Sequence, residues 1–213
     1  MRFQAAIFDL DGTLIDSLAD IGTSMNNALA AHGLPQHPIQ AYRQFVGEGV
    51  EVLTRKASGN HPTLQAEVLA TYRGLYGENL FGHTAPYAGI PELLTELRKQ
   101  PIALAVLSNK PHVSTQRLVA ALFADVPFRA VYGQRAEVPR KPDPTAALQI
   151  ALDLGVKAGD CVFIGDSAID MQTANAAGMF AVGVTWGFRT REELTQFGAH
   201  AVIDAPLELL GVI

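Results

Sequence analysis

The sequence predicts an α/β protein in which a doubly wound, mainly parallel sheet carries a small helical domain inserted after the first strand. Three observations predict this class. Short apolar runs bounded by polar residues recur along the chain, which is typical of buried strands. Helix-like segments lie between most of these runs, which favours parallel strands joined by helices. One long stretch near the start of the chain contains helix-like segments alone.

Six apolar runs are the predicted strands. They are residues 3–10, 102–107 and 161–164 and, with a weaker pattern, residues 130–132, 180–184 and 201–203. The helices predicted between them are residues 112–123, 143–154 and 168–177. Leu118 and Leu122 lie four residues apart, on one face of the first of these helices. Asp143 and Pro144 are typical of a helix start, and Gly178 follows the third helix as a stop.

A helical stripe opens the stretch that breaks this alternation. Leu18, Ile21, Met25 and Leu29 follow helical spacing, and the Gly-Leu-Pro sequence at residues 33–35 ends the pattern. Further helix-like segments lie at residues 40–45, 50–57 and 63–80.

The domain boundaries follow from this stretch. We predict an inserted α-helical cap domain at residues 16–80 and an α/β catalytic core at residues 1–15 and 81–213, with the return to the core in the turn-rich residues 82–89. An alternative is that the helices of residues 16–80 simply cover one face of the sheet.

Composition limits the function classes. The chain has 213 residues, of which 48% are apolar and 17% charged, so we expect a packed core rather than a disordered chain. The net charge of −5 disfavours a sequence-blind grip on nucleic acid. No apolar run approaches 18 residues and no leader pattern is visible, so we expect no membrane association and a cytoplasmic location. Cys161, the single cysteine, cannot form an internal disulfide. Monomer and homodimer both stay open.

Polar side chains follow three of the predicted strands. Asp9 and Asp11 follow the first strand, Ser108 and Asn109 the second, and Asp166 the third. In open parallel sheets, ligands bind beyond the carboxyl ends of the strands. We therefore expect these groups to share one site.

Two further residues belong to this pattern. Asp170 lies one helical turn after Asp166, and Lys141 lies in the loop before a predicted helix. Each residue alone could be a turn former, a helix cap or a solvated acid in a first helical turn. Those explanations do not account for acids, a hydroxyl and a lysine gathering at strand ends together.

Four motifs, taken in order, resemble those of the haloacid-dehalogenase superfamily of phosphatases. They are Asp-Leu-Asp-Gly-Thr at residues 9–13, Ser-Asn at 108–109, Lys-Pro at 141–142, and Gly-Asp-Ser-Ala-Ile-Asp at 165–170. The resemblance spans nearly the whole chain. It implies a Rossmann-like core with an inserted cap, and a Mg²⁺-dependent phosphatase that forms an aspartyl-phosphate.

The resemblance also implies a role for each acid. Asp9 would be the nucleophile and a metal ligand. Asp11 would protonate the leaving alcohol and then deprotonate water, and its backbone carbonyl would bind the metal. Asp166 would be a further metal ligand, and Asp170 would act through a metal-bound water.

The phosphate-binding groups follow by the same resemblance. Ser108 and the Asn109 amide would hold phosphoryl oxygens, and Lys141 would offset their charge. Elementary electrostatics agrees, because carboxylates repel a phosphate dianion unless cations intervene. Hard oxygen ligands suit Mg²⁺.

Single residues separate the members of the superfamily. Dehalogenases lack a second acid at the position of Asp11, because a halide leaves without a proton. Phosphonate-cleaving relatives use a cap lysine; because Lys56 is a cap lysine, that interpretation is weakened rather than excluded. Sugar phosphomutases usually carry Glu-Asp at the position of Gly165 and Asp166, which favours a hydrolase.

Three stretches are similar to phosphoglycolate phosphatases, namely residues 45–49, 107–111 and 183–187. We therefore expect a small phosphorylated metabolite as the partner, with 2-phosphoglycolate converted to glycolate and phosphate. Alternatives are a broad sugar-phosphate phosphatase, a pyrophosphatase, or a non-catalytic phosphate-binding regulatory module. In the cap, Arg55 or Lys56 is expected to bind a substrate carboxylate, although a solvated helix face is an open alternative.

Overall fold

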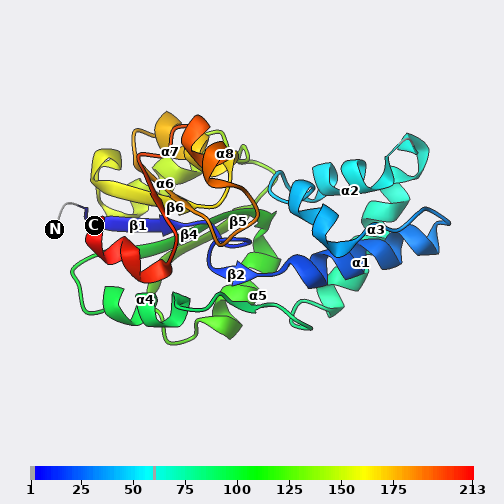
Figure 1. The fold of residues 1–213 in the computed structure, drawn as a ribbon, viewed down its shortest axis with the longest axis horizontal. Helices are drawn as coiled ribbons and strands as arrows, with labels where there is room; N and C mark the ends of the chain where they lie inside the picture. Colours follow the sequence, from blue (N-terminus) through cyan, green and yellow to red (C-terminus); the bar gives the residue numbers. More distant parts are fainter. Residues whose placement is uncertain (1–2, 60) are drawn as a thin grey trace.

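A six-stranded parallel sheet forms the centre of the larger part of the molecule (Figure 1). The computed structural model describes residues 3–59 and 61–213. The strand order is β5-β4-β1-β6-β7-β8, and every neighbouring pair is parallel. The strands are β1 (Ala5–Phe8), β4 (Ala103–Pro111), β5 (Phe128–Gln134), β6 (Cys161–Gly165), β7 (Phe180–Val184) and β8 (Ala201–Ile203). This architecture confirms the predicted fold class.

Helices cover both faces of the sheet. They are α4 (Ile90–Leu97), α5 (His112–Leu122), α6 (Thr145–Leu154), α7 (Ala168–Ala176) and α8 (Arg191–Gln196), with 3₁₀ turns η3 (Ala158–Asp160) and η4 (Pro206–Gly211). Alternate residues of β1 point to opposite faces. Ala6 and Phe8 pack in one apolar cluster with α4 and α5, whereas Ala5 and Ile7 pack in a second with α6, α7 and α8. The sheet is therefore doubly wound.

Strand β1 determines where the site lies. It pairs with β4 on one side and β6 on the other, and Phe8 is level with Val106 and Ile164. The residues that follow these three positions therefore emerge together at one edge of the sheet. Strand β4 continues past the end of β1, because its last residue, Pro111, still pairs with Gln134 of β5. Ser108 and Asn109 thus lie inside β4, whereas the apolar pattern had placed them after it.

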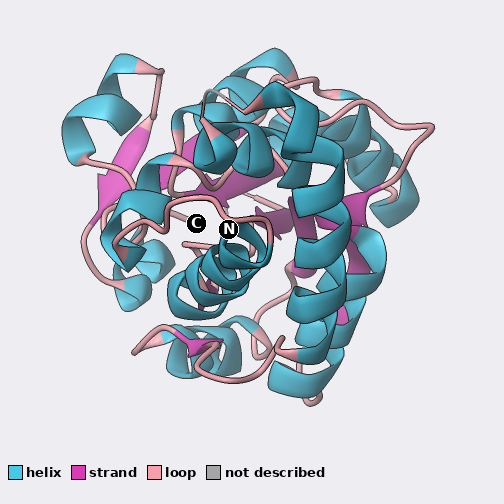
Figure 2. Cartoon of the chain, turned by 90° about the vertical axis from the view of Figure 1, so that its right-hand side faces the viewer, coloured by secondary structure: helices cyan, strands magenta, loops and turns pink. Residues whose placement is uncertain are grey.

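A helical part projects from this edge, at the right of Figure 1 and towards the viewer in Figure 2. It contains α1 (Leu18–Ala31), η1 (Ile39–Gln44), α2 (Val50–Ser58), η2 (Pro62–Leu64) and α3 (Gln65–Glu78). Ile21, Met25 and Leu29 of α1 are buried with Tyr72 and Tyr76 of α3. We call this helical part the cap; its domain boundaries stay a prediction.

Two short strands, β2 (Ile15–Asp16) and β3 (Ala85–Pro86), flank the cap and pair antiparallel with each other. Neither was predicted, because two residues carry no period. Beside them, the buried carboxylate of Asp20 accepts hydrogen bonds from the backbone N–H groups of His83 and Thr84 and from the Thr84 hydroxyl, at 2.7–2.9 Å. Asp20 therefore joins the start of the cap to its end.

Candidate active site

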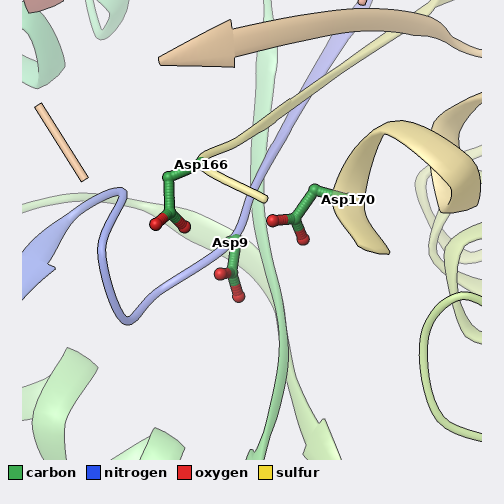
Figure 3. Close-up of side chains that lie close together, drawn as sticks. All are labelled: Asp9, Asp166 and Asp170. Atoms are coloured by element: carbon green, nitrogen blue, oxygen red, sulfur yellow. The ribbon is translucent and has the colours of Figure 1, made fainter. Parts of the chain in front are cut away.

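Three buried carboxylates meet at the carboxyl end of the sheet. Asp9 follows β1, Asp166 follows β6, and Asp170 lies in the first turn of α7. Each offers an oxygen atom, and these oxygens lie within 4.8 Å of one another. Figure 3 shows the three side chains converging on a common space. The arrangement brings together three residues that the sequence motifs select.

Neighbouring groups orient two of these carboxylates. Asp166 accepts hydrogen bonds from the Phe188 backbone N–H at 2.7 Å and from the Thr13 hydroxyl at 3.3 Å. Asp170 accepts from the backbone and hydroxyl of Ser167 at 3.1 and 2.6 Å, as part of a helix capping box. Their rotamers are thereby fixed before any ligand binds.

Glycines allow the backbone to approach these acids. A Cβ atom on Gly187 would lie 2.3 Å from the Asp166 side chain, and one on Gly12, whose φ is +91°, would meet the same carboxylate at 2.3 Å. A Cβ on Gly165 would lie 2.3 Å from the Cβ of Asp170. Any larger residue at these positions would displace the acids.

Lys141 supplies the positive charge of the cluster. Its Nζ donates to Asp9 Oδ1 at 2.8 Å and to Asp170 Oδ1 at 2.7 Å. Burial acts to lower the pKa of Lys141, but Asp170 and Asp9 more than offset that effect, so its pKa is raised. Lys141 therefore stays an ammonium throughout the physiological range.

The pKa values of two carboxylic acids in the cluster are also raised, which favours their neutral forms. Burial raises the pKa of Asp9 to about 7, against the lowering influence of Lys141, and Asp170 adds to the rise. Burial, followed by repulsion from Asp170 and Asp9, also holds the pKa of Asp166 well above its usual value. If all three acids were ionised, the single ammonium would leave an excess of buried negative charge. This donor set of hard oxygens fits a divalent cation such as Mg²⁺, which would relieve that repulsion.

Asp11 lies beside this cluster and has different partners. It accepts a hydrogen bond from the Ser17 hydroxyl at 2.6 Å and from Lys110 Nζ at 2.9 Å on both carboxylate oxygens. Asp9 and Asp11 line the same cavity, as expected for residues two apart in an extended segment.

Ser108 and Asn109 also line that cavity, but their side chains differ in function. The Ser108 hydroxyl accepts from the Lys110 backbone N–H at 3.2 Å. The Asn109 side chain instead braces the loop of Lys141, since it exchanges two 3.0 Å hydrogen bonds with the backbone of that residue. It also donates to the Gly47 carbonyl of the cap at 3.0 Å. The sequence motif contained no sign of this bracing role.

The cavity itself lies between the sheet edge and the cap. Its volume is about 50 Å³. Its cap wall is largely apolar and is formed by Ile21, Val46, Val50, Leu53, Tyr72 and Tyr76, and its floor by Asp9, Asp11, Ser108, Asn109 and Lys110.

The two cap residues expected to bind substrate lie elsewhere. Lys56 Nζ donates to Glu48 Oε1 at 2.7 Å and to the Gln44 carbonyl at 3.0 Å. Arg55 is exposed on α2, and neither residue lines the cavity in the part of the chain that the structure describes. The structure does not bring them to the other site residues, and their role stays a prediction.

Lys110 is the site residue for which sequence reasoning found no role. The signal was present, however: Lys110 lies two residues after Ser108, and such residues share one side of a strand. Thr13 and Ser17 likewise contact the acids through hydroxyls that are common in turns and caps, so their presence in the sequence was not distinctive.

The fold and the site agree with a family match. A model of the haloacid dehalogenase-like hydrolase family matches residues 6–184. The chain belongs to this family of hydrolases.

Relatives of known class indicate which type of hydrolase this chain is. The chain is 32% identical to the phosphoglycolate phosphatase of Haemophilus influenzae, over 100% of this chain and 99% of the relative. It is 34% identical to the phosphoglycolate phosphatase of Pseudomonas putida, over 94% of this chain and 76% of the relative. The chain is thus an enzyme of the phosphoric monoester hydrolase class, as predicted.

Solved structures show the same architecture. A protein from Lactobacillus delbrueckii subsp. bulgaricus superimposes with a TM-score of 0.93 at 32% identity, covering 100% of this chain and 99% of the other. A predicted phosphoglycolate phosphatase from Haemophilus somnus gives 0.91 at 28% identity, covering 100% and 98%. In the described residues, no helix has the length and apolar character needed to cross a bilayer.

Proposed function

We propose that this enzyme hydrolyses 2-phosphoglycolate to glycolate and phosphate in a Mg²⁺-dependent reaction. The observation that carries the proposal is the buried cluster of Asp9, Asp166 and Asp170 around Lys141, beside a small cavity under the cap. The phosphoglycolate phosphatases among its relatives support the choice of substrate.

Asp9 is the proposed nucleophile. One of its oxygens attacks phosphorus, the bond from phosphorus to the leaving oxygen breaks, and Asp11 supplies the proton that the departing alkoxide needs. Water then attacks phosphorus as Asp11 takes its proton, which releases phosphate and regenerates Asp9. Both side chains face the same cavity, where a single phosphoryl group could contact them.

The remaining residues would bind and balance charge. Ser108 and the Asn109 amide would hold phosphoryl oxygens, and Lys141 would neutralise charge near Asp9. Asp9, the Asp11 carbonyl and Asp166 would hold Mg²⁺, with Asp170 reaching it through water. When bound, Mg²⁺ supplies Lewis-acid stabilisation of the phosphoryl oxygens.

The cavity supports a small leaving group. The apolar cap residues Val46, Val50 and Leu53 lie directly over the cavity, which favours glycolate over a bulkier hexose as the leaving group. A sugar phosphate is bulkier than 2-phosphoglycolate, whereas pyrophosphate is similar to it in size, so the cavity disfavours the sugar phosphate more than pyrophosphate. The binding of a substrate carboxylate by Arg55 or Lys56 stays a prediction, as does the cytoplasmic location.

Metal removal tests this proposal. With Mg²⁺, the enzyme should hydrolyse both 2-phosphoglycolate and p-nitrophenyl phosphate, and EDTA should lower both rates by roughly a hundredfold or more. Added Mg²⁺ should restore them, as followed by phosphate release. Activity that survives full chelation would contradict the metal role. Absence of turnover with every divalent ion would instead favour a phosphate-binding module.

A further inference from the structure

Lys110 occupies an unusual position in the cavity floor. It lies near the end of β4, its side chain is 4% exposed, and its Nζ is 2.9 Å from each oxygen of Asp11. The same Nζ lies 4.7 Å from the centroid of the Tyr76 ring in α3. A buried lysine held between a core carboxylate and a cap ring has a fixed position.

One donor of this ammonium has no protein acceptor. A lysine ammonium has three N–H groups, and two are directed at the oxygens of Asp11. Within residues 3–59 and 61–213, no other acceptor of Lys110 Nζ is present. The third donor is therefore available to a ligand in the cavity, which Lys110 lines.

The apolar cap wall makes Lys110 a selective contact for an anion. Among the described residues that line the cavity, Lys110 is the one cationic side chain. The facing surface consists mainly of apolar cap residues such as Ile21, Val46 and Leu53, which offer nothing to an anion. Charge interactions gain strength where apolar groups exclude water.

Tyr76 adds an independent observation. It also lines the cavity, and its buried hydroxyl has no hydrogen-bond partner among the described residues. A buried polar group without a partner is costly, and a ligand acceptor is one way to satisfy it. The unpartnered hydroxyl thus belongs to the same side chain that packs against Lys110.

We propose that Lys110 is the specificity-determining residue of the site and binds the carboxylate of the leaving group. This assignment rests on the proposed phosphatase function and deepens it: the preferred substrates are small phosphate esters whose leaving alcohol carries a carboxylate. It places carboxylate recognition in the core, two residues from Ser108, rather than on α2. Lys56 is already engaged by Glu48 and the Gln44 carbonyl, outside the cavity.

Two matched substrates test the assignment. 2-Phosphoglycolate carries the carboxylate, whereas 2-hydroxyethyl phosphate has a neutral hydroxymethyl group in its place. The measured quantity is the ratio of kcat/KM for the two esters with Mg²⁺, because any general damage to Asp11 cancels in this ratio. The wild type should favour 2-phosphoglycolate.

Three variants separate the candidate residues. Lys110→Met should lower the ratio by roughly 10- to 100-fold, since it removes a hydrogen bond to a charged group. Lys110→Arg, which keeps the charge, should retain most of the preference. The double variant Arg55→Ala with Lys56→Ala should leave the ratio unchanged, and Lys99→Met is a surface control.

Binding without turnover provides a second measurement. In an Asp9→Asn background, calorimetry should show that Lys110→Met weakens 2-phosphoglycolate binding at least tenfold more than it weakens 2-hydroxyethyl phosphate binding. This comparison holds even if Lys110→Met alone is inactive towards both esters.

Several results would overturn the assignment. They are a wild type without preference, a Lys110→Met variant with an unchanged ratio, and a preference that is lost only in the Arg55 and Lys56 double variant. An active enzyme without preference contradicts this assignment alone. An enzyme inactive on both esters and on p-nitrophenyl phosphate contradicts the proposed function as well.

Discussion

Asp9 is held between opposing influences at the end of β1. Burial and the nearby carboxylate of Asp170 favour its protonated form, whereas the hydrogen bond from Lys141 favours the charged form. A nucleophilic carboxylate must be ionised, so a divalent cation that compensates the charge would also activate Asp9.

Replacing the carboxylate of Asp9 by an amide tests the covalent step. Asp9→Asn keeps the shape of the side chain but gives a poor nucleophile, so turnover of 2-phosphoglycolate should fall at least about 10³-fold. Phosphate release measures the rate, and Asp125→Asn on the surface is the matched control. Retention of more than a few per cent of the wild-type rate would refute Asp9 as the nucleophile.

Whether the role of a site residue could be predicted depends on how directly a sequence motif encodes its contacts. Asp9, Asp166 and Asp170 were selected from the sequence because they occur together with a hydroxyl and a lysine in four ordered motifs, and the structure brings the three acids together. The contacts of Asn109 and Lys110 depend on the cap and on loops distant in the chain. A linear pattern does not contain such contacts.

The strands and helices of the core were largely predictable, because burial imposes a period on them. The apolar runs at residues 180–184 and 201–203 coincide with β7 and β8. In the cap, the predicted segment 40–45 overlaps the 3₁₀ turn η1, and the predicted segment 63–80 overlaps η2 and α3. Helix α4 and the β2–β3 pair went unpredicted, since β2 and β3 are too short to show a pattern.

The connection between cap and core depends on Asp20 at the start of α1. Burial acts to raise the pKa of Asp20, but hydrogen bonds from His83 and Thr84 more than offset it and lower the pKa. The ionised carboxylate therefore stabilises the fold above its unfolded pKa, and this contribution is lost as the pH falls through the lowered folded value.

Removing this carboxylate should loosen the connection. Asp20→Ala leaves the buried N–H of Thr84 without its acceptor, so the free energy of unfolding should fall by about 3 kcal/mol at pH 7. Urea denaturation provides the measurement. The exposed Asp125→Ala should change stability by less than about 0.5 kcal/mol, and an equal loss in both variants would show that Asp20 has no special role.

The closed arrangement of the whole molecule relies on polar contacts between cap and core. Arg43 of η1 donates to the backbone carbonyls of Gly187 and Phe188, and Arg189 donates to the carbonyls of Arg43 and Val46. These hydrogen bonds join the cap to the core beside the cavity that Asp9 and Val46 line. Burial of the acids shields the reacting groups from bulk water. It also raises the pKa values of Asp9 and Asp166.

The cost of ionising these buried acids should lower the stability of the metal-free enzyme as the pH rises. The pKa of Asp9 rises from 3.8 to about 7 on folding, so the folded state binds more protons than the unfolded chain between these values. The Asp9 contribution therefore destabilises the fold progressively as the pH rises from about 4 to about 7, and Asp166 acts in the same direction.

Denaturation in EDTA at pH 5 and pH 8 measures this effect. Because other groups also titrate in this range, the relevant quantity is the difference between the wild type and Asp9→Asn. From pH 5 to pH 8, Asp9→Asn should lose less stability than the wild type, by an amount on the order of a few kcal/mol, and Asp125→Asn should match the wild type. Mg²⁺ should stabilise the wild type more at pH 8 than at pH 5, since it replaces the protons that the acids release. Identical pH dependence in the wild type and Asp9→Asn would mean that Asp9 is not strained by its surroundings, and the electrostatic case for a cation at this site would then fail.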